Sequence, residues 1–118
     1  MPSALIAILP CSDIDASEAF YARLGFRRHD SEHGGYRILV HPAGGELHLR
    51  LAEAGWLMRG RNPLGVYFYT EDVDALAARI GARPEDKPWG MYEFALSDPD
   101  DTLVRIGWPT RQRVPRPR

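Results

Sequence analysis

Two short stretches, SDIDA and EDVDA, repeat one pattern half a chain apart, and this repeat constrains the fold more than any other feature. Aligning them places Asp72 on Asp13 and Asp74 on Asp15, an offset of 59 residues in a chain of 118. A duplicated structural module is the economical explanation. Chance similarity between two strand-to-helix junctions is the alternative, because five residues make a short match.

Each copy of the pattern lies between an apolar run and a glycine. The run ALIAILP is followed by CSDIDASEAFYARLGF, in which Asp13 or Asp15 can cap a helix that stops at Gly25. The run GVYFY is followed by acidic residues, a helix rich in Ala, Leu and Ile, and Gly81. Each copy therefore predicts a strand, a capped helix and a glycine stop.

Further strands are expected after each helix. GYRILVH and ELHLRLA follow the first helix, with one more short strand near residues 27–31, and MYEFALS and TLVRIGW follow the second, joined by the turn DPDD. This order predicts an α+β fold of two β-α-β-β units, over residues 1–60 and 61–109 of a single domain. Because one helix covers only one sheet face, we expect the modules to form a curved mixed sheet with the helices outside.

The composition is that of a globular domain and excludes several partners. With 44% hydrophobic residues, 26% charged residues and a net charge of −1, the chain has no general attraction for nucleic acid or an anionic membrane, and it has no transmembrane segment. Residues 110–118, TRQRVPRPR, are expected to form a basic solvated tail, with a nucleic-acid arm as the alternative. The start of the chain lacks the pattern of a signal peptide, so we expect a cytoplasmic protein.

The single cysteine, Cys11, is expected to be a small buried hydrophobe and not a nucleophile.

Alternation along the strands predicts which side chains face the concave surface. In ELHLRLA, Leu47, Leu49 and Leu51 share the side that faces the helix, which directs His48 and Arg50 to the concave side. In the last two strands the helix side carries Tyr92, Phe94, Leu96, Val104 and Ile106, and the concave side carries Trp89, Met91, Glu93, Ala95 and Arg105. The concave surface is thus expected to combine apolar walls with charge.

Three segments, LPCSDIDASEAFYARLGF, GGYRIL and PWGMYEFALSDPDDTLVRI, resemble the bleomycin-resistance proteins of the glyoxalase/dioxygenase superfamily, also called vicinal oxygen chelate proteins. The resemblance spans residues 5–108. It implies paired βαβββ modules, a homodimer and a ligand cleft built jointly by two subunits. Asp101 stands where the family usually has glycine, which requires a left-handed backbone or a different turn.

The resemblance also implies where superfamily enzymes hold a metal ion. The four ligand positions correspond to Ile6, His48, Val66 and Arg105, and only His48 can coordinate a metal. A catalytic divalent ion normally needs three protein ligands, and a protonated arginine repels it. We therefore expect no metal, no cofactor and no catalytic residue, with a shifted site using His48 and Glu93 as the alternative. The remaining histidines, His29, His33 and His41, are expected on the solvated surface.

What the resemblance implies for function is sequestration. Bleomycin-resistance proteins hold a flat ring system between aromatic side chains, and Tyr36 and Trp89 occupy the matching positions. Core packing is the alternative for both residues, and dimer packing is the alternative for Trp56. The expected ligand-binding residues are Tyr36, Ile38, His48, Arg50, Trp56, Phe68, Trp89, Met91, Glu93 and Arg105.

Three functional hypotheses follow. The first is a metal-free, non-enzymatic homodimer that sequesters a planar aromatic compound, with bleomycin-like antibiotics among the candidates. The second is a metal-dependent isomerase, lyase or dioxygenase of the same superfamily with a relocated metal site. The third is a partner-binding or regulatory module that uses the basic tail. Because Arg50 and Arg105 make the predicted cleft less acidic than a polycationic drug favours, either an anionic ligand or a pair between Arg105 and Glu93 is possible.

Overall fold

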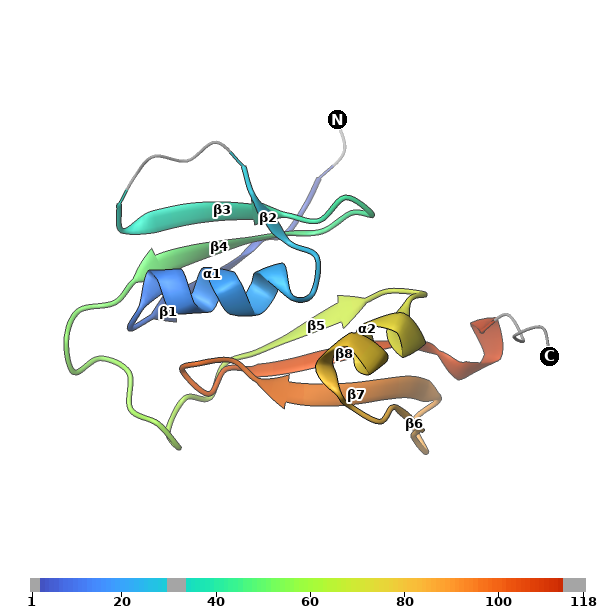
Figure 1. Cartoon of the computed structure of the whole chain (residues 1–118). Coiled ribbons are helices and arrows are strands. Elements are labelled where there is room, and N and C mark those ends of the chain that lie inside the picture. Colours follow the sequence, from blue (N-terminus) through green and yellow to red (C-terminus); the bar gives the residue numbers. More distant parts are fainter. Residues whose placement is uncertain (1–2, 30–33, 114–118) are drawn as a thin grey trace. The chain divides into compact units, whose positions relative to one another are not determined.

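The structure is a computed structural model that describes residues 3–29 and 34–113 (Figure 1). His33 and residues 114–118 of the predicted tail lie outside the described residues. The chain divides into two compact units, Met1–Leu64 with Ser97–Thr102, and Gly65–Leu96 with Leu103–Arg118. The second unit thus begins four residues after the predicted module boundary, and the turn DPDD belongs with the first unit. No helix among the described residues has the length and apolar character needed to cross a membrane.

The first unit has the order βαβββ. Its elements are β1 (Ala7–Cys11), α1 (Ile14–Ala22), β2 (Arg27–Arg28), β3 (Tyr36–Val40) and β4 (Glu46–Leu51). They form a sheet of order β1-β4-β3-β2, in which β1 is parallel to β4 and β3 is antiparallel to it. The strand β2 confirms the short strand expected near residues 27–31.

The second unit repeats this order and topology. Its elements are β5 (Gly65–Tyr69), α2 (Val73–Ile80), β6 (Glu85–Asp86), β7 (Met91–Ser97) and β8 (Leu103–Pro109), followed by a 3-10 turn, η1 (Thr110–Gln112). The sheet order is β5-β8-β7-β6, with β5 parallel to β8. The repeated order confirms the α+β fold of paired βαβββ modules. The sequence did not predict β6, because two exposed acidic residues show no apolar alternation.

The N-terminal ends of the two helices are capped differently. Asp13 caps α1, since its side chain accepts a hydrogen bond from the backbone N–H of Ala16 at 3.1 Å. The expected acidic cap of α2 is wrong: the side chain of Asp72 makes no capping bond, and its own N–H donates to the Thr70 hydroxyl at 3.2 Å. Gly81 ends α2 as expected, with a left-handed φ of 84° and its N–H bonded to the carbonyl of Ala77.

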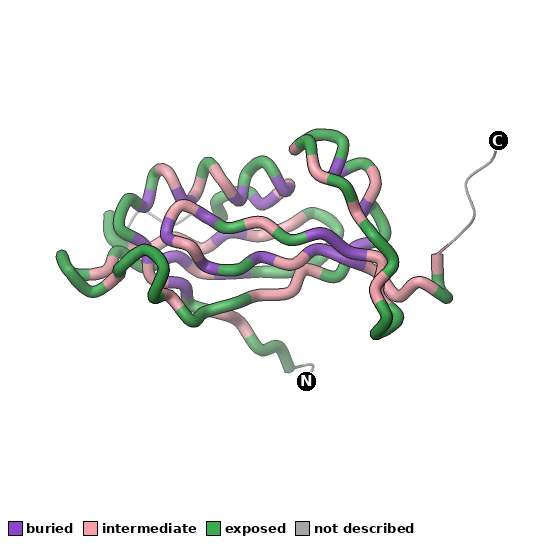
Figure 2. The backbone as a smooth tube through the Cα atoms, turned by 90° about the horizontal axis from the view of Figure 1, so that it is seen from below, coloured by how far each residue is buried: buried purple, intermediate pink, exposed green. Residues whose placement is uncertain are grey.

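Each helix covers one face of its own sheet. α1 packs against β4 and α2 against β8, and buried positions alternate with more exposed ones along these strands (Figure 2). The helix-facing positions Leu47, Leu49, Phe94, Val104 and Ile106 are buried as expected. Tyr92 and Leu96 are half-buried. Leu51 is exposed at the last position of β4, where alternation alone predicted a helix-facing side chain.

Cys11 and His41, two side chains outside the candidate site, have structural roles. Cys11 is buried, and burial raises the pKa of its thiol to about 11, so it is a core residue as expected. The expectation that His41 is solvated is wrong. Its Nδ1 accepts from the N–H of Ala43 and its Nε2 lies 3.1 Å from the carbonyl of Leu24. His41 therefore stabilises its own turn, while His29 is exposed as expected.

Folded structure continues past the predicted end of the domain. Thr110–Gln112 form η1, and the guanidinium of Arg113 lies 3.5 Å from the ring centroid of Tyr92 and 3.4 Å from the carboxylate of Asp74. The first four residues of the expected solvated tail are thus part of the second unit. The guanidinium of Arg113 makes a cation–π contact with Tyr92, which the amino-acid composition of the tail does not predict.

Candidate ligand-binding site

The centre of the second unit's open sheet face is a buried carboxylate, Glu93 of β7, which is only 1% exposed. Its Oε1 accepts hydrogen bonds from the indole Nε1–H of Trp89 at 2.8 Å and from the Tyr67 hydroxyl at 3.2 Å. Its Oε2 accepts from Nη1 of Arg105 at 2.8 Å. Glu93 thus holds three side chains from β5, β8 and the loop before β7 in fixed positions.

The charge of Glu93 is maintained by these donors. Burial by itself raises the pKa of the carboxyl, but the hydrogen bonds from Trp89, Arg105 and Tyr67 and the charge of Arg105 together lower it below its ordinary value. Burial first, and then the neighbouring Glu93, raise the pKa of the Tyr67 hydroxyl, which stays protonated and donates. The cluster is therefore a hydrogen-bonded ion pair in which Glu93 stays ionised.

Gly107 of β8 leaves room for this cluster. A Cβ added at Gly107 would collide with the Tyr67 hydroxyl and would lie 2.7 Å from the Cβ of Glu93. The sheet therefore carries no side chain at the point where Tyr67 and Glu93 meet. This role of Gly107 could not be predicted from the sequence, because a glycine inside a strand has several explanations.

Trp89 is positioned by Glu93 but presents its ring to solvent. Its N–H is bonded to the buried carboxylate, whereas 61% of the residue remains exposed. A hollow of about 540 Å³ lies beside it, lined by Trp89, Gly90, Met91, Pro109, Thr110, Arg111 and Gln112. We call this the Trp89 pocket. A flat ring that is held in place and exposed beside a hollow is suited to stacking on a planar ligand.

The first unit carries a second polar chain along β3 and β4. The Tyr36 hydroxyl lies 2.6 Å from Nδ1 of His48, and Nε2 of His48 lies 2.7 Å from the carboxylate of Glu46. Ile38 is the register partner of His48, so both side chains lie on the same sheet face. Arg50 is exposed, with its guanidinium 5.7 Å from the ring of Trp56. The structure thus brings the five predicted residues of this unit onto β3, β4 and the following loop.

The donor set does not fit the metal ion that the superfamily fold implies. Both ring nitrogens of His48 are engaged by Tyr36 and Glu46, and Arg105 occupies another of the four ligand positions. Residues 3–29 and 34–113 contain no group of three or more His, Cys, Asp or Glu side chains placed to hold a metal. Coordination by His48 would require breaking one of its two hydrogen bonds.

Two sequence assignments on β5 need correction. Val66 pairs in register with the buried Val104, so it lies on the helix side, and Tyr67 is the residue that lies beside Arg105. Phe68, an expected ligand contact, pairs with the buried Ile106 and therefore lies on the opposite face from the Glu93 cluster. The error has a simple cause: a one-residue shift in a strand exchanges its two faces. The missed residue is Tyr67.

The acidic turn DPDD is a structural anchor within the first unit. Asp98 accepts from the N–H groups of Asp100 and Thr102 at 2.8 and 3.0 Å and from the Tyr21 hydroxyl at 2.8 Å. Asp100 accepts from the N–H of Ser12 at 3.0 Å and from the Ser12 hydroxyl. Asp101 has a left-handed φ of 64°. Of the two expectations for this position, a left-handed backbone or a different turn, the structure shows the first. The carboxylates of this turn are thus committed to the fold.

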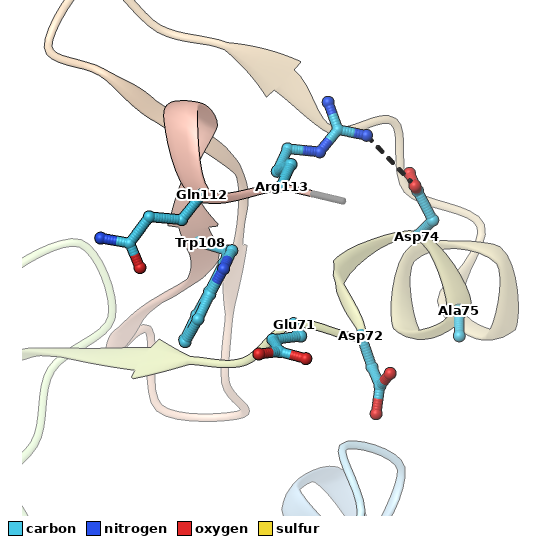
Figure 3. Close-up of a pocket in the computed structure, with 7 residues that line it drawn as sticks. All are labelled: Glu71, Asp72, Asp74, Ala75, Trp108, Gln112 and Arg113. Atoms are coloured by element: carbon cyan, nitrogen blue, oxygen red, sulfur yellow. Dashed lines mark hydrogen bonds and ion pairs between the residues drawn. The ribbon is translucent and has the colours of Figure 1, made fainter. Parts of the chain in front are cut away.

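A second hollow of about 250 Å³ lies at the start of α2 (Figure 3). Glu71, Asp72 and Asp74 line one part of it, and Trp108, Gln112 and Arg113 line another. Arg113 pairs with Asp74, which also accepts a hydrogen bond from the Tyr92 hydroxyl. Gln112 lines this hollow and the Trp89 pocket, so η1 separates an acidic hollow from a pocket that has no acidic lining residue.

Solved structures support the fold independently. A bleomycin-binding protein complexed with bleomycin aligns with a TM-score of 0.78 and 24% identity over 91% of this chain and 98% of that chain. A bleomycin resistance determinant encoded on the transposon Tn5 gives 0.78 and 24% over 92% and 98%. A lactoylglutathione lyase from Agrobacterium tumefaciens gives 0.69 and 22% over 94% and 97%. At these identities the similarity establishes the fold.

Sequence comparisons establish the family. No curated protein matches significantly. The family described as Glyoxalase/Bleomycin resistance protein/Dioxygenase superfamily matches residues 4–106, which is most of the chain and nearly the span of the expected resemblance. The chain therefore belongs to the glyoxalase/bleomycin resistance protein/dioxygenase superfamily.

Proposed function

We propose that this protein is a small-molecule binding protein of the bleomycin-resistance type, which sequesters a planar aromatic compound without a metal ion and without turning it over. The observation that carries the proposal is the state of Trp89. Its indole N–H is bonded to a buried carboxylate, the residue is 61% exposed, and a pocket lies beside it. A ring held in this way can stack on a ligand with little further loss of side-chain entropy.

The alternatives to binding have less support. Glu93, the only buried glutamate of the described residues, accepts hydrogen bonds from three donors, and its pKa is lowered. A general base needs a pKa near the working pH, and the lowered pKa of Glu93 does not meet this requirement. The bleomycin-binding relative supports the ligand class, whereas the lyase relative shows that the same fold also occurs in enzymes. A homodimer, with the ligand cleft at its interface, is part of the proposal.

Titration with planar compounds, bleomycin included, tests this function by quenching of tryptophan fluorescence. We expect saturable quenching in the wild type and a roughly tenfold or greater loss of affinity in Trp89→Ala, because stacking and ring burial are removed. Trp89→Phe should retain part of the affinity, since it keeps a flat face. Trp108→Phe is the matched control, because Trp108 does not line the Trp89 pocket.

The outcomes separate the hypotheses. Equal quenching in the wild type and in Trp89→Ala would contradict the proposed site, and no quenching by any planar compound would contradict sequestration. Metal analysis of the purified protein tests the second hypothesis. About one tightly bound divalent ion per chain would contradict the metal-free proposal and favour a relocated enzymatic site.

A further inference from the structure

The residues that follow the last strand form one wall of the Trp89 pocket. The N–H of Thr110 donates to the carbonyl of Gly90 at 2.9 Å, and its hydroxyl donates to Asp86 at 2.9 Å. The N–H of Arg113 closes η1 on the carbonyl of Thr110 at 3.2 Å. These three bonds fix Pro109–Gln112 opposite the loop that carries Trp89, so this wall is part of the folded unit.

The charge of this wall is positive. Of the seven lining residues, Arg111 alone is charged. Arg111 is exposed, and no ion pair engages it in the part of the chain that the structure describes. Two acidic side chains contact the elements around this pocket: Asp86 accepts a hydrogen bond from the Thr110 hydroxyl, and Glu93 is paired with Arg105. The acidic side chains at the start of α2 line the other hollow.

We infer that the Trp89 pocket selects planar aromatic compounds that carry an anionic group, with Arg111 pairing with the anion while Trp89 stacks on the ring. The inference rests on the proposed function and adds the charge of its ligand. A guanidinium offers a planar set of donors that matches a carboxylate, so Arg111 is the specificity-determining residue. A cationic ligand gains nothing at this wall, because it meets an unpaired positive charge.

Isothermal titration calorimetry with three probes of one shape tests the inference. The probes are 2-naphthoate, the neutral 2-naphthamide and the cationic 2-(aminomethyl)naphthalene. We expect 2-naphthoate to bind roughly three- to tenfold more tightly than 2-naphthamide, since an exposed charge-assisted bond contributes modestly. Arg111→Gln should remove this preference, while Arg111→Lys should retain part of it. Arg83→Gln, an exposed arginine outside the pocket, is the matched control.

The results distinguish failure of this inference from failure of the proposed function. If 2-naphthamide or the cationic probe binds as tightly as 2-naphthoate, or if Arg111→Gln leaves the preference intact, the inference is wrong and aromatic binding stands. If none of the three probes binds the wild type, both are contradicted. Higher salt should also weaken 2-naphthoate binding more than 2-naphthamide binding, because only the former depends on charge pairing.

Discussion

Glu93 is the residue on which the order of the candidate site depends. A carboxylate that is 1% exposed is costly unless its charge is compensated, and here Trp89, Tyr67 and Arg105 compensate it. The same bonds orient the exposed indole and the guanidinium. A single buried acid thus links the stability of β5, β7 and β8 to the shape of the ligand-binding surface.

Glu93→Gln should destabilise the protein and disorder the site together. We expect the free energy of unfolding to fall by about 1–3 kcal/mol. Arg105 would lose its counter-charge, and the glutamine amide would have only one oxygen to accept hydrogen bonds in place of the two carboxylate oxygens. Urea denaturation measures this change. Glu85→Gln is the control, since its exposed pair with Lys87 at 3.0 Å should contribute less than about 1 kcal/mol. Equal losses in the two variants would contradict the role assigned to Glu93.

The stabilisation by Glu93 should depend on pH in a defined direction. Its folded pKa is lowered below the ordinary value of 4.5, so the unfolded chain takes up the proton first as pH falls. The stability that Glu93 contributes is therefore present above about pH 4.5 and lost below it, towards the folded pKa. Urea midpoints between pH 7 and pH 3 should converge for wild type and Glu93→Gln as the pH falls. A constant difference over that range would contradict this linkage.

Gly107→Ala tests the close approach beneath the cluster. The new Cβ would lie 2.9 Å from the carbonyl oxygen of Tyr92 as well as meeting Tyr67 and Glu93, so we expect a loss of about 1–3 kcal/mol from overpacking. Gly65→Ala is the matched strand control, because the nearest atom to its added Cβ is at 3.6 Å, an ordinary contact. Thermal and urea unfolding of the two variants check the prediction. Similar stability of both would show that the cluster tolerates a methyl group.

At the scale of elements, the turn between β7 and β8 stabilises the first unit, whereas the strands it joins form the sheet of the second unit. It forms part of the first unit, where Asp98 accepts a hydrogen bond from the hydroxyl of Tyr21 in α1. The acidic turn that characterises the family sequence thus anchors a helix. This explains why three aspartates near one another do not provide free metal ligands.

Removing the bond between helix and turn should destabilise the first unit. We expect Tyr21→Phe to cost about 1 kcal/mol, and Asp98→Asn to cost about 2–3 kcal/mol, because Asp98 is 4% exposed and accepts three donors. Urea denaturation checks both values. Asp101→Asn is the control within the same turn, since asparagine tolerates a left-handed φ and can accept from Gly60. A larger effect of Asp101→Asn than of Asp98→Asn would reverse this assignment.

At the scale of the whole molecule, the proposed homodimer makes a prediction of its own. The loop after β4 exposes Trp56 by 65% and Met58 by 57%, and exposed apolar groups of this size are typical of a protein interface. We expect light scattering to give twice the mass of one chain. Met58→Glu should raise the dimer dissociation constant by roughly tenfold or more, whereas Ala54→Glu in the same loop should have a smaller effect. A single-chain mass at all concentrations would contradict the dimer.

Most of the fold could be predicted because it depends on local patterns. The repeat of SDIDA and EDVDA, the cap at Asp13 and the stop at Gly81 are features of short segments, and the structure confirms them. Alternation also placed His48 and Glu93 opposite the buried helix-facing residues. It failed at Leu51, which is exposed at the end of its strand.

The sequence by itself determined the duplicated α+β module and the superfamily, because these follow from residue types and their spacing. Only the tertiary structure decided how those side chains are paired. Glu93 meets Tyr67 across 26 positions and Arg105 across 12, and Arg113 returns to Tyr92 and Asp74. Register and hydrogen-bond geometry between distant segments have no local signature. They place Thr110–Gln112, the first three residues of the expected solvated tail, in one wall of the Trp89 pocket.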